Sequence, residues 1–227
     1  MKCVVVGNSC SALCGEYGKT IESTDIVIRC NNFVTTRFER FVGFRTDIWF
    51  LSILAKKSFR TLPSVIHGNS PEYVRYFFKE HDGFWFVPEC KKICVRSNLS
   101  HKNTKQTLQK ITTPIPLPNV EFFPNEILMD VSSRVFCPST GLLAIFYAMR
   151  FFGYGNVSVV GFKSTKDIPR WRSFGGLENF YVYNDATEHA RYYEMAVSVG
   201  EHYTTHNYAV EWSIIKYLYE TDKIRIL

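Results

Sequence analysis

The chain has 227 residues, 46% of them hydrophobic and 21% charged, which is enough for one globular domain with a full core. A net charge of +6 favours anionic ligands or peripheral contact with an anionic membrane surface, whereas the scattered basic residues argue against nucleic-acid binding. The seven cysteines follow no zinc-site spacing and no apolar run is long enough to span a bilayer, so neither a metal site nor a transmembrane segment is expected.

Strand-like runs alternate with stretches that can form helices, at 2–7, 25–29, 46–51, 64–67 and 84–87. This alternation predicts βαβ units with a mostly parallel sheet, and the continuous apolar runs are typical of strands covered on both faces. Pro71 favours the start of a helix that continues to His81. We therefore expect an α/β fold in a single domain over residues 1–227.

Two irregular stretches interrupt the pattern. Residues 96–118 are the most polar part of the chain and predict an exposed, mobile excursion. Residues 163–186 form an irregular stretch that carries Pro169, Gly175 and Gly176, and they predict a lid. Between them, residues 141–152 are apolar nearly all round, which predicts a buried central helix followed by a strand-like run over 157–162.

The first strand ends in Gly7-Asn8-Ser9. Glycine lets the backbone turn sharply near a ligand, and the asparagine amide can bind a ribose or a phosphate. A second asparagine, Asn31, follows the second strand. The alternative is an ordinary turn in which Ser9 or Ser11 caps a short helix. The chain has no G-x-G-x-x-G and no Walker lysine, which disfavours a dinucleotide or NTPase site.

Pro138-Ser139-Thr140-Gly141 leads into the apolar helix. Such a start gives a capped helix whose free amides and dipole favour an anion, although a plain cap is the alternative. Since the carboxyl ends of parallel strands meet at one edge of the sheet, the two asparagines and this cap together favour a nucleotide site.

Near the C-terminus, Thr205 or His206 is expected to begin a helix that carries Val210, Ile214 and Leu218. A histidine at a helix N-terminus stays neutral near pH 7 and can accept a proton, which makes His206 a candidate general base. The chain contains no D-x-D carboxylate pair, so the expected chemistry needs no metal ion.

Taken in order, these blocks resemble the signature motifs of animal-type sialyltransferases. The long motif is similar to residues 5–9, 25–31 and 41–46, and the short motif to residues 138–142 through Gly161-Phe162. A third motif resembles residues 191–194. The very short H-x4-E motif is similar to His206 through Glu211.

The resemblance implies a GT-A-like α/β/α sandwich. It also implies an inverting, metal-independent transfer of sialic acid, or of a related acid such as Kdo, from a CMP-activated donor to a glycan or glycolipid acceptor, with no cofactor. His206 would deprotonate the acceptor hydroxyl, and Arg191 with His189 would stabilise the departing phosphate. The residues implied in donor binding are Asn8, Ser9, Asn31, Ser139, Thr140, Gly141, Gly161, Phe162 and Tyr192.

The chain departs from the family pattern at two places. Arg191 stands where the family usually has His or Tyr, and it offers a fixed cation. Cys3 occupies the first position of the family's disulfide, but the expected partner position holds Phe152, so no bridge is expected. Without that bridge, and with no membrane stem ahead of the domain, we expect a bacterial or viral relative that works in the cytoplasm.

Two other function classes are weighed against a transferase. A nucleotide-binding module that has lost catalysis would keep the turns but would not need His206. A methyltransferase-like α/β enzyme would need an acidic residue at the end of the second strand, which this chain lacks. The acceptor and the oligomeric state are left open by the sequence.

Overall fold

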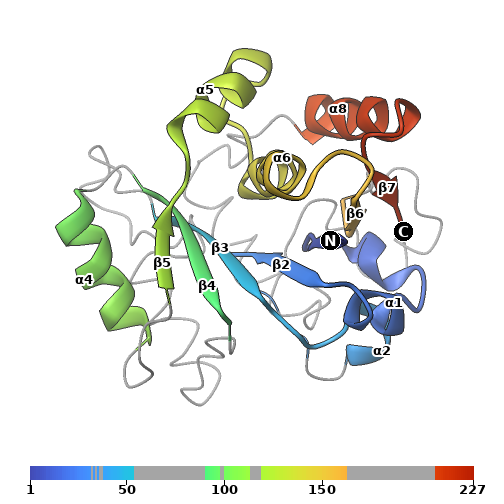
Figure 1. Cartoon of the computed structure of the whole chain (residues 1–227), viewed down its shortest axis with the longest axis horizontal. Helices are drawn as coiled ribbons and strands as arrows, with labels where there is room; N and C mark the ends of the chain where they lie inside the picture. Colours follow the sequence, from blue (N-terminus) through green and yellow to red (C-terminus); the bar gives the residue numbers. More distant parts are fainter. Residues whose placement is uncertain are drawn as a thin grey trace, which may run out of the picture.

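The computed structural model describes residues 1–31, 33, 35, 38–53, 90–97, 100–112, 119–162 and 208–227. In this part of the chain, seven strands form one sheet in the order β5-β4-β3-β2-β1-β6-β7, and each neighbouring pair is parallel (Figure 1). The strands are β1 (Cys3–Val6), β2 (Ile26–Cys30), β3 (Ile48–Ile53), β4 (Lys92–Ser97), β5 (Asn119–Phe122), β6 (Val157–Val160) and β7 (Arg225–Ile226).

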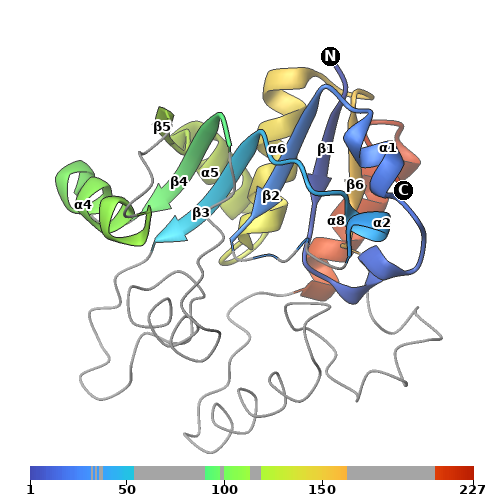
Figure 2. The same ribbon diagram turned by 90° about the horizontal axis from the view of Figure 1, so that it is seen from below.

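Helices cover both faces of the sheet (Figures 1 and 2). One face carries α5 (Asn125–Arg134), α6 (Thr140–Phe152) and α8 (Tyr208–Glu220). The other face carries α1 (Gly18–Glu22), α2 (Glu39–Val42) and α4 (His101–Thr112). The predicted α/β/α sandwich is therefore confirmed, and β1, β2 and β3 form at the first three strand-like runs. None of the described helices combines the length and apolarity needed to cross a membrane.

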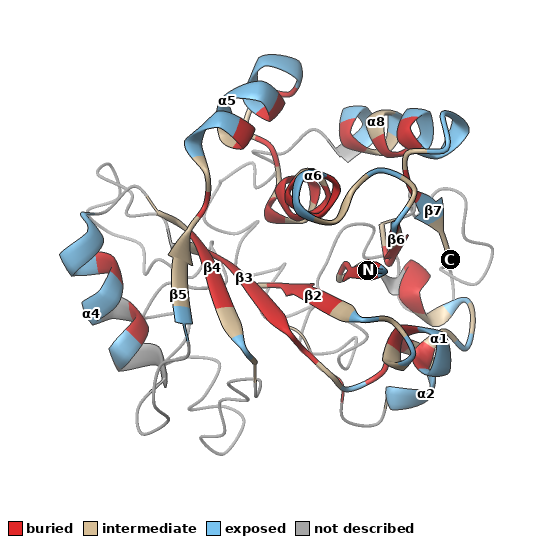
Figure 3. Cartoon of the chain, in the orientation of Figure 1, coloured by how far each residue is buried: buried red, intermediate tan, exposed pale blue. Residues whose placement is uncertain are grey.

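The sheet separates the core into two sides because side chains alternate along each strand. In β1, Cys3 and Val5 pack on the α6 side, while Val4 and Val6 pack on the side of α1 and α2. All four are at most 1% exposed, as the continuous apolar run predicts. The predicted central helix is confirmed in α6, which is buried along most of its length (Figure 3).

The predicted exposed excursion over 96–118 contains regular secondary structure where it is described, and its mobility stays a prediction. Within that range, β4 ends at Ser97 and α4 forms a regular helix. Thr104 and Leu108 of α4 are fully buried, and Leu108 packs with Trp49 of β3. These positions are four residues apart and therefore lie on one helix face, while the residues at 101–103, 105, 106 and 109 are polar and exposed. The buried face of α4 is so narrow that most residues of the helix are polar, and the segment therefore resembles an exposed one in sequence.

Several sequence predictions lie outside the described residues. These are the strand-like runs 64–67 and 84–87, the helix from Pro71 to His81, and the lid over 163–186. The strands β4, β5 and β7 were not predicted at all. Each is short or carries polar residues, as in the Lys92–Ser97 and Asn119–Phe122 segments.

Cys3 is a buried free thiol, as expected from the Phe152 at its partner position. Burial, with a smaller contribution from the Asp47 carboxylate, raises the pKa of Cys3 to about 12. Burial likewise raises the pKa of Cys30 to about 12. Both thiols therefore act as small apolar core residues near neutral pH.

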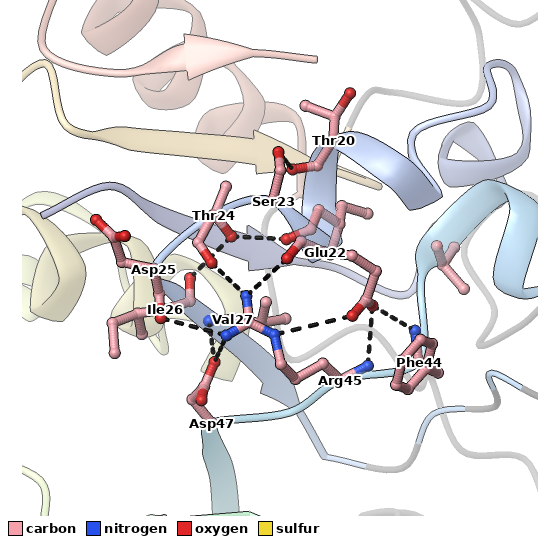
Figure 4. A network of polar contacts seen from close by, with 12 residues as sticks. Thr20, Glu22, Ser23, Thr24, Asp25, Ile26, Val27, Phe44, Arg45 and Asp47 are labelled. Atoms are coloured by element: carbon pink, nitrogen blue, oxygen red, sulfur yellow. Dashed lines mark hydrogen bonds and ion pairs between the residues drawn. The ribbon is translucent and has the colours of Figure 1, made fainter.

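A charged network joins the amino ends of β2 and β3 (Figure 4). Asp47 is only 2% exposed, and its Oδ2 accepts the N–H of Val27 at 2.9 Å and lies 3.0 Å from Arg45 Nη1. Its Oδ1 lies 2.8 Å from Lys91 Nζ. Glu22 Oε1 accepts the N–H of Arg45 at 3.0 Å. The carboxylates of Asp47 and Glu22 are therefore each matched by a group of opposite charge.

Candidate donor-binding site

The turns after β1 and β6 are in direct backbone contact. A Cβ added to Gly7 would lie 2.4 Å from the carbonyl oxygen of Gly161, and Gly161 has a φ of +76°. Gly7 N–H donates to the Val160 carbonyl at 2.8 Å, and Ser9 N–H donates to the Gly161 carbonyl at 3.0 Å. No residue with a side chain fits at Gly7 without displacing that backbone, so glycine is required for the two strand ends to meet.

The ring of Phe162 brings the first turn and the start of α6 together. A Cβ on Gly141 would lie 2.6 Å from Phe162 Cε1, and a Cβ on Gly7 would lie 2.9 Å from Phe162 Cε2. The two glycines therefore flank one aromatic ring. The glycine turn near residue 7 and the helix start near residue 140 converge in space, as the sequence predicts for a shared site.

Each asparagine ties neighbouring strand ends to one another. Asn8 Nδ2 donates to the Cys30 carbonyl at 3.0 Å, which links the ends of β1 and β2. Asn31 has a left-handed φ of 52°, and its Oδ1 accepts the N–H of Ser52 at 3.2 Å. Both side chains are half-buried, at the carboxyl edge where the sequence predicts a nucleotide.

Ser9 adopts the capping role that the sequence leaves open as an alternative. Its Oγ accepts the N–H of Ser11 at 3.3 Å, at the start of a 3-10 helix, Cys10–Leu13. This contact orders the turn that follows Asn8. Binding of a ligand by Ser9 stays a prediction.

Ser52 belongs to the same edge, although sequence reasoning missed it. Its Oγ lies 2.6 Å from Thr140 Oγ1, which joins the end of β3 to the first residue of α6. Ile48 and Phe50 point to the α6 side, and alternation puts Ser52 on that side as well. A lone hydroxyl that ends an apolar strand was the available signal.

The α6 N-cap is held by a carboxylate from α8. The predicted cap is confirmed, because Ser139 Oγ accepts the N–H of Leu142 at 3.1 Å. Glu211, only 4% exposed, accepts the N–H of Ser139 at 2.7 Å and its hydroxyl at 2.5 Å. The cap therefore already carries a negative charge. Within the described part of the chain, the N–H groups of Thr140 and Gly141 have no hydrogen-bond acceptor, so a ligand could use them.

Arg96 holds the residue before that cap. Its Nη1 donates to the Pro138 carbonyl at 3.0 Å. Burial lowers the pKa of the half-buried guanidinium, and the nearby Cys137 thiol partly opposes that shift. Arg96 and Glu211 thus contact successive residues of one short loop with opposite charges.

The remaining predicted site residues lie outside the described residues: His189, Arg191, Tyr192 and His206. The described part of α8 begins at Tyr208, so the predicted helix start at Thr205 or His206 also lies outside. In the ranges that are described, no group of three or more His, Cys, Asp or Glu side chains could hold a metal ion.

The sequence model of glycosyltransferase family 29 (sialyltransferase) matches residues 1–223. The chain is 28% identical over 163 residues to CMP-N-acetylneuraminate-beta-galactosamide-alpha-2,3-sialyltransferase 2 of Mus musculus, covering 71% of this chain and 43% of that relative. The rat protein of the same name matches to the same extent. A 52-residue stretch is 48% identical to a beta-1,6-galactosyltransferase of Arabidopsis thaliana, covering 23% of this chain and 13% of that one.

The chain spans less than half the length of these relatives. They come from rodents and a plant, and their names mention sialic acid or galactose. They therefore give no support to a bacterial or viral origin or to a Kdo donor.

Solved structures share the fold. A crystal structure of a mammalian sialyltransferase in complex with Gal-beta-1-3GalNAc-ortho-nitrophenol superposes with a TM-score of 0.56 at 21% identity, covering 99% of this chain and 68% of that one. A second crystal structure of a mammalian sialyltransferase gives a TM-score of 0.54 at 20% identity, with the same coverage. The GT-A-like arrangement expected from the sequence is thereby confirmed.

Proposed function

Since the chain belongs to glycosyltransferase family 29 (sialyltransferase), we propose that it transfers sialic acid from CMP-sialic acid to a glycan acceptor. The rodent relatives that match 71% of the chain are named for this reaction. The observation that carries the proposal is the contact of one ring, Phe162, with both Gly7 and Gly141. It joins the long-motif and short-motif turns at the carboxyl edge of a parallel sheet, where nucleotides bind in such folds.

The proposed roles divide between two parts of this edge. Asn8 and Asn31 at the ends of β1 and β2 would bind the cytidylate, with its oxyanions near the amides of Thr140 and Gly141. The acceptor hydroxyl would lose its proton to His206 as it attacks the anomeric carbon of the donor and the C–O bond to the phosphate breaks, with inversion. Arg191 and His189 would stabilise the phosphate that leaves as CMP.

A panel of nucleotides tests the donor class directly. We expect CMP to raise the melting temperature more than CDP, UMP, UDP or GDP at equal concentration, because only the state that binds ligand is stabilised. A larger shift with UDP or GDP than with CMP would reject the CMP-sugar donor.

Turnover separates an enzyme from a binding module. Purified protein supplied with CMP-sialic acid and EDTA is expected to release CMP steadily, because the proposed chemistry uses protein groups rather than a metal ion. Binding of CMP without any release of CMP, with or without a galactose-terminated acceptor, would favour the inactive nucleotide-binding module.

A galactosyltransferase is the second candidate function. The 48% identity over 52 residues to the plant galactosyltransferase favours it, since that local identity is higher than the identity to the rodent enzymes. The same nucleotide panel decides between the two. A preference for UDP, with release of UDP from UDP-galactose, would support galactose transfer.

The cytoplasmic location and peripheral membrane contact stay predictions. The first is based on the odd cysteine count and the second on the net charge of +6. Cell fractionation of the natural protein, with a high-salt wash of the membrane pellet, tests both.

A further inference from the structure

Arg96 lies on the same edge and the same side of the sheet as the proposed donor site. It pairs in register with Ser52 of the neighbouring strand β3. In β4, Cys94 packs into the core beneath α6, so alternation places Arg96 on the α6 side too. The Nη1 contact with Pro138 agrees with this placement. The ends of β3 and β4 therefore present a hydroxyl and a guanidinium side by side below the start of α6.

The Arg96 guanidinium has no carboxylate partner in the described residues, in contrast to Arg45. Arg45 lies 3.0 Å from Asp47, whereas the hydrogen bond found for Arg96 among these residues goes to a neutral carbonyl. Arg96 is half-buried, so it loses hydration, and no described residue supplies a counter-charge. A guanidinium retains several donors after one carbonyl contact, and its planar fork matches a carboxylate.

The negative charge of Glu211 means that an acidic ligand near the α6 cap needs a cation to bind. Its carboxylate is bound to the Ser139 N–H and hydroxyl. An incoming carboxylate near the α6 cap would therefore meet a like charge, which disfavours binding unless a cation lies nearby. Arg96, held against Pro138 in the same loop, supplies that cation.

The position along the edge indicates which part of a ligand Arg96 meets. β4 is two strands beyond β2, which ends at Asn31, and this corresponds to about 10 Å. A nucleotide held at Asn8 and Asn31 with its phosphate at the amide of Thr140, whose hydroxyl contacts Ser52 of β3, would extend its sugar toward β4.

We infer that Arg96 recognises the carboxylate of an acidic sugar at this edge, either the sialic acid of the donor or an acidic residue of the acceptor. This inference rests on the proposed function. It assigns Arg96 a binding role besides its hold on Pro138.

The test compares Arg96→Met with Arg150→Met, which removes the same charge from an exposed position near the end of α6. Calorimetric titrations measure the affinities for CMP and for CMP-3-fluoro-sialic acid, a donor analogue that carries the carboxylate. If the carboxylate belongs to the donor, Arg96→Met is expected to lower the affinity for the analogue about tenfold or more. The affinity for CMP is then expected to change by less than about twofold. Arg150→Met is expected to leave both affinities unchanged.

A second arm addresses the acceptor. Galacturonate-terminated and galactose-terminated oligosaccharides are titrated into the CMP-loaded proteins. A wild-type preference for the galacturonate ligand that Arg96→Met abolishes, with the donor analogue unaffected, supports the acceptor source. Arg96→Lys keeps the charge but lacks the planar fork, so we expect it to retain part of the preference that Arg96→Met loses. It also replaces Arg96→Met in the test if that variant does not fold.

Two outcomes overturn the inference. If neither preference changes in Arg96→Met or Arg96→Lys, Arg96 binds no carboxylate. If CMP and the analogue weaken by the same factor and the melting temperature falls, Arg96 only supports the loop at Pro138. Failure of wild-type protein to bind either CMP or the analogue would instead reject the proposed function, whatever the variants do.

Discussion

Polar residues have different partners at the amino edge and at the carboxyl edge of the parallel sheet. At the amino edge, Asp47 is surrounded by Arg45, Lys91 and the Val27 amide, so its buried charge is neutralised within the protein. At the carboxyl edge, the described residues are mainly neutral amides and hydroxyls that bridge strand ends, together with Arg96 and the Glu211 carboxylate. Buried charge that is fully paired serves the fold, whereas groups with remaining hydrogen-bonding capacity can serve a ligand.

The largest effect is expected from His206→Ala, which removes the proposed general base. Loss of a general base is expected to lower turnover about 10²- to 10⁴-fold, while CMP affinity stays within a factor of two, because the proposed base would act on the acceptor rather than on the nucleotide. Initial rates and CMP titrations measure the two quantities. His101→Ala, at an exposed histidine that stacks on Phe122, is the control and should retain full turnover. Full turnover in His206→Ala would exclude the proposed base.

Gly161→Ala tests whether the carboxyl edge depends on close backbone contact. We expect a loss of about 3 kcal/mol in unfolding free energy, because the new Cβ meets the Gly7 carbonyl in addition to the strain of a positive φ. Gly155→Ala has a φ of +75° and its nearest neighbour is 3.7 Å away, so it should lose only about 1 kcal/mol. Urea unfolding measures both. Equal losses would mean that the backbone contact costs nothing to disturb.

Asp47→Ala tests the amino edge. Removing the buried carboxylate leaves the Val27 amide unpaired and Arg45 without its closest acid, so we expect a loss of about 2 to 3 kcal/mol in unfolding free energy. CMP affinity of the folded variant should not change. Asp130→Ala removes an exposed partner of Arg134 and should cost about 0.5 kcal/mol or less. A fall in CMP affinity in folded Asp47→Ala would show that the two edges are coupled.

The smallest effect is expected from Glu211→Gln. The amide keeps the shape but can accept through only one atom, so one of the two contacts with Ser139 is lost, at about 1 kcal/mol. Loss of the negative charge should at the same time strengthen binding of CMP-3-fluoro-sialic acid relative to CMP. Glu220→Gln, exposed at the end of the same helix, should change neither. A lower affinity of Glu211→Gln for the analogue, relative to CMP, would contradict the repulsion proposed for this carboxylate.

Local patterns in the sequence predict the central strand β1 and the central helix α6, but not the peripheral elements of the fold. β1 and α6 were predictable because they are buried nearly all round and read as continuous apolar runs. α4 was missed because only a thin stripe of it, including Leu108, faces the core. β7 pairs along only two residues, Arg225 and Ile226, and its place depends on a neighbour far away in the chain.

The candidate site divides in the same way. Asn8, Asn31 and the Ser139 cap could be predicted, because turns after apolar strands and caps before apolar helices are local features. The partners Ser52, Arg96 and Glu211 could not, since each acts through contacts with residues distant in sequence. Glu211 meets Ser139 across 72 positions and Ser52 meets Thr140 across 88. Such pairs follow from strand register and helix packing, which no single segment encodes.

The hold of Glu211 on Ser139 has a consequence for the segment between β6 and α8. That segment departs at Phe162, whose ring packs on Gly141, and returns through Glu211, which is bonded to Ser139. Both anchors therefore fall within the first turn of one helix. Because the two anchors lie close together, the loop-closure entropy of the intervening chain is lost when they form. Breaking the contact between Glu211 and Ser139 would therefore weaken two things at once, the α6 cap and the attachment of the returning chain to α6.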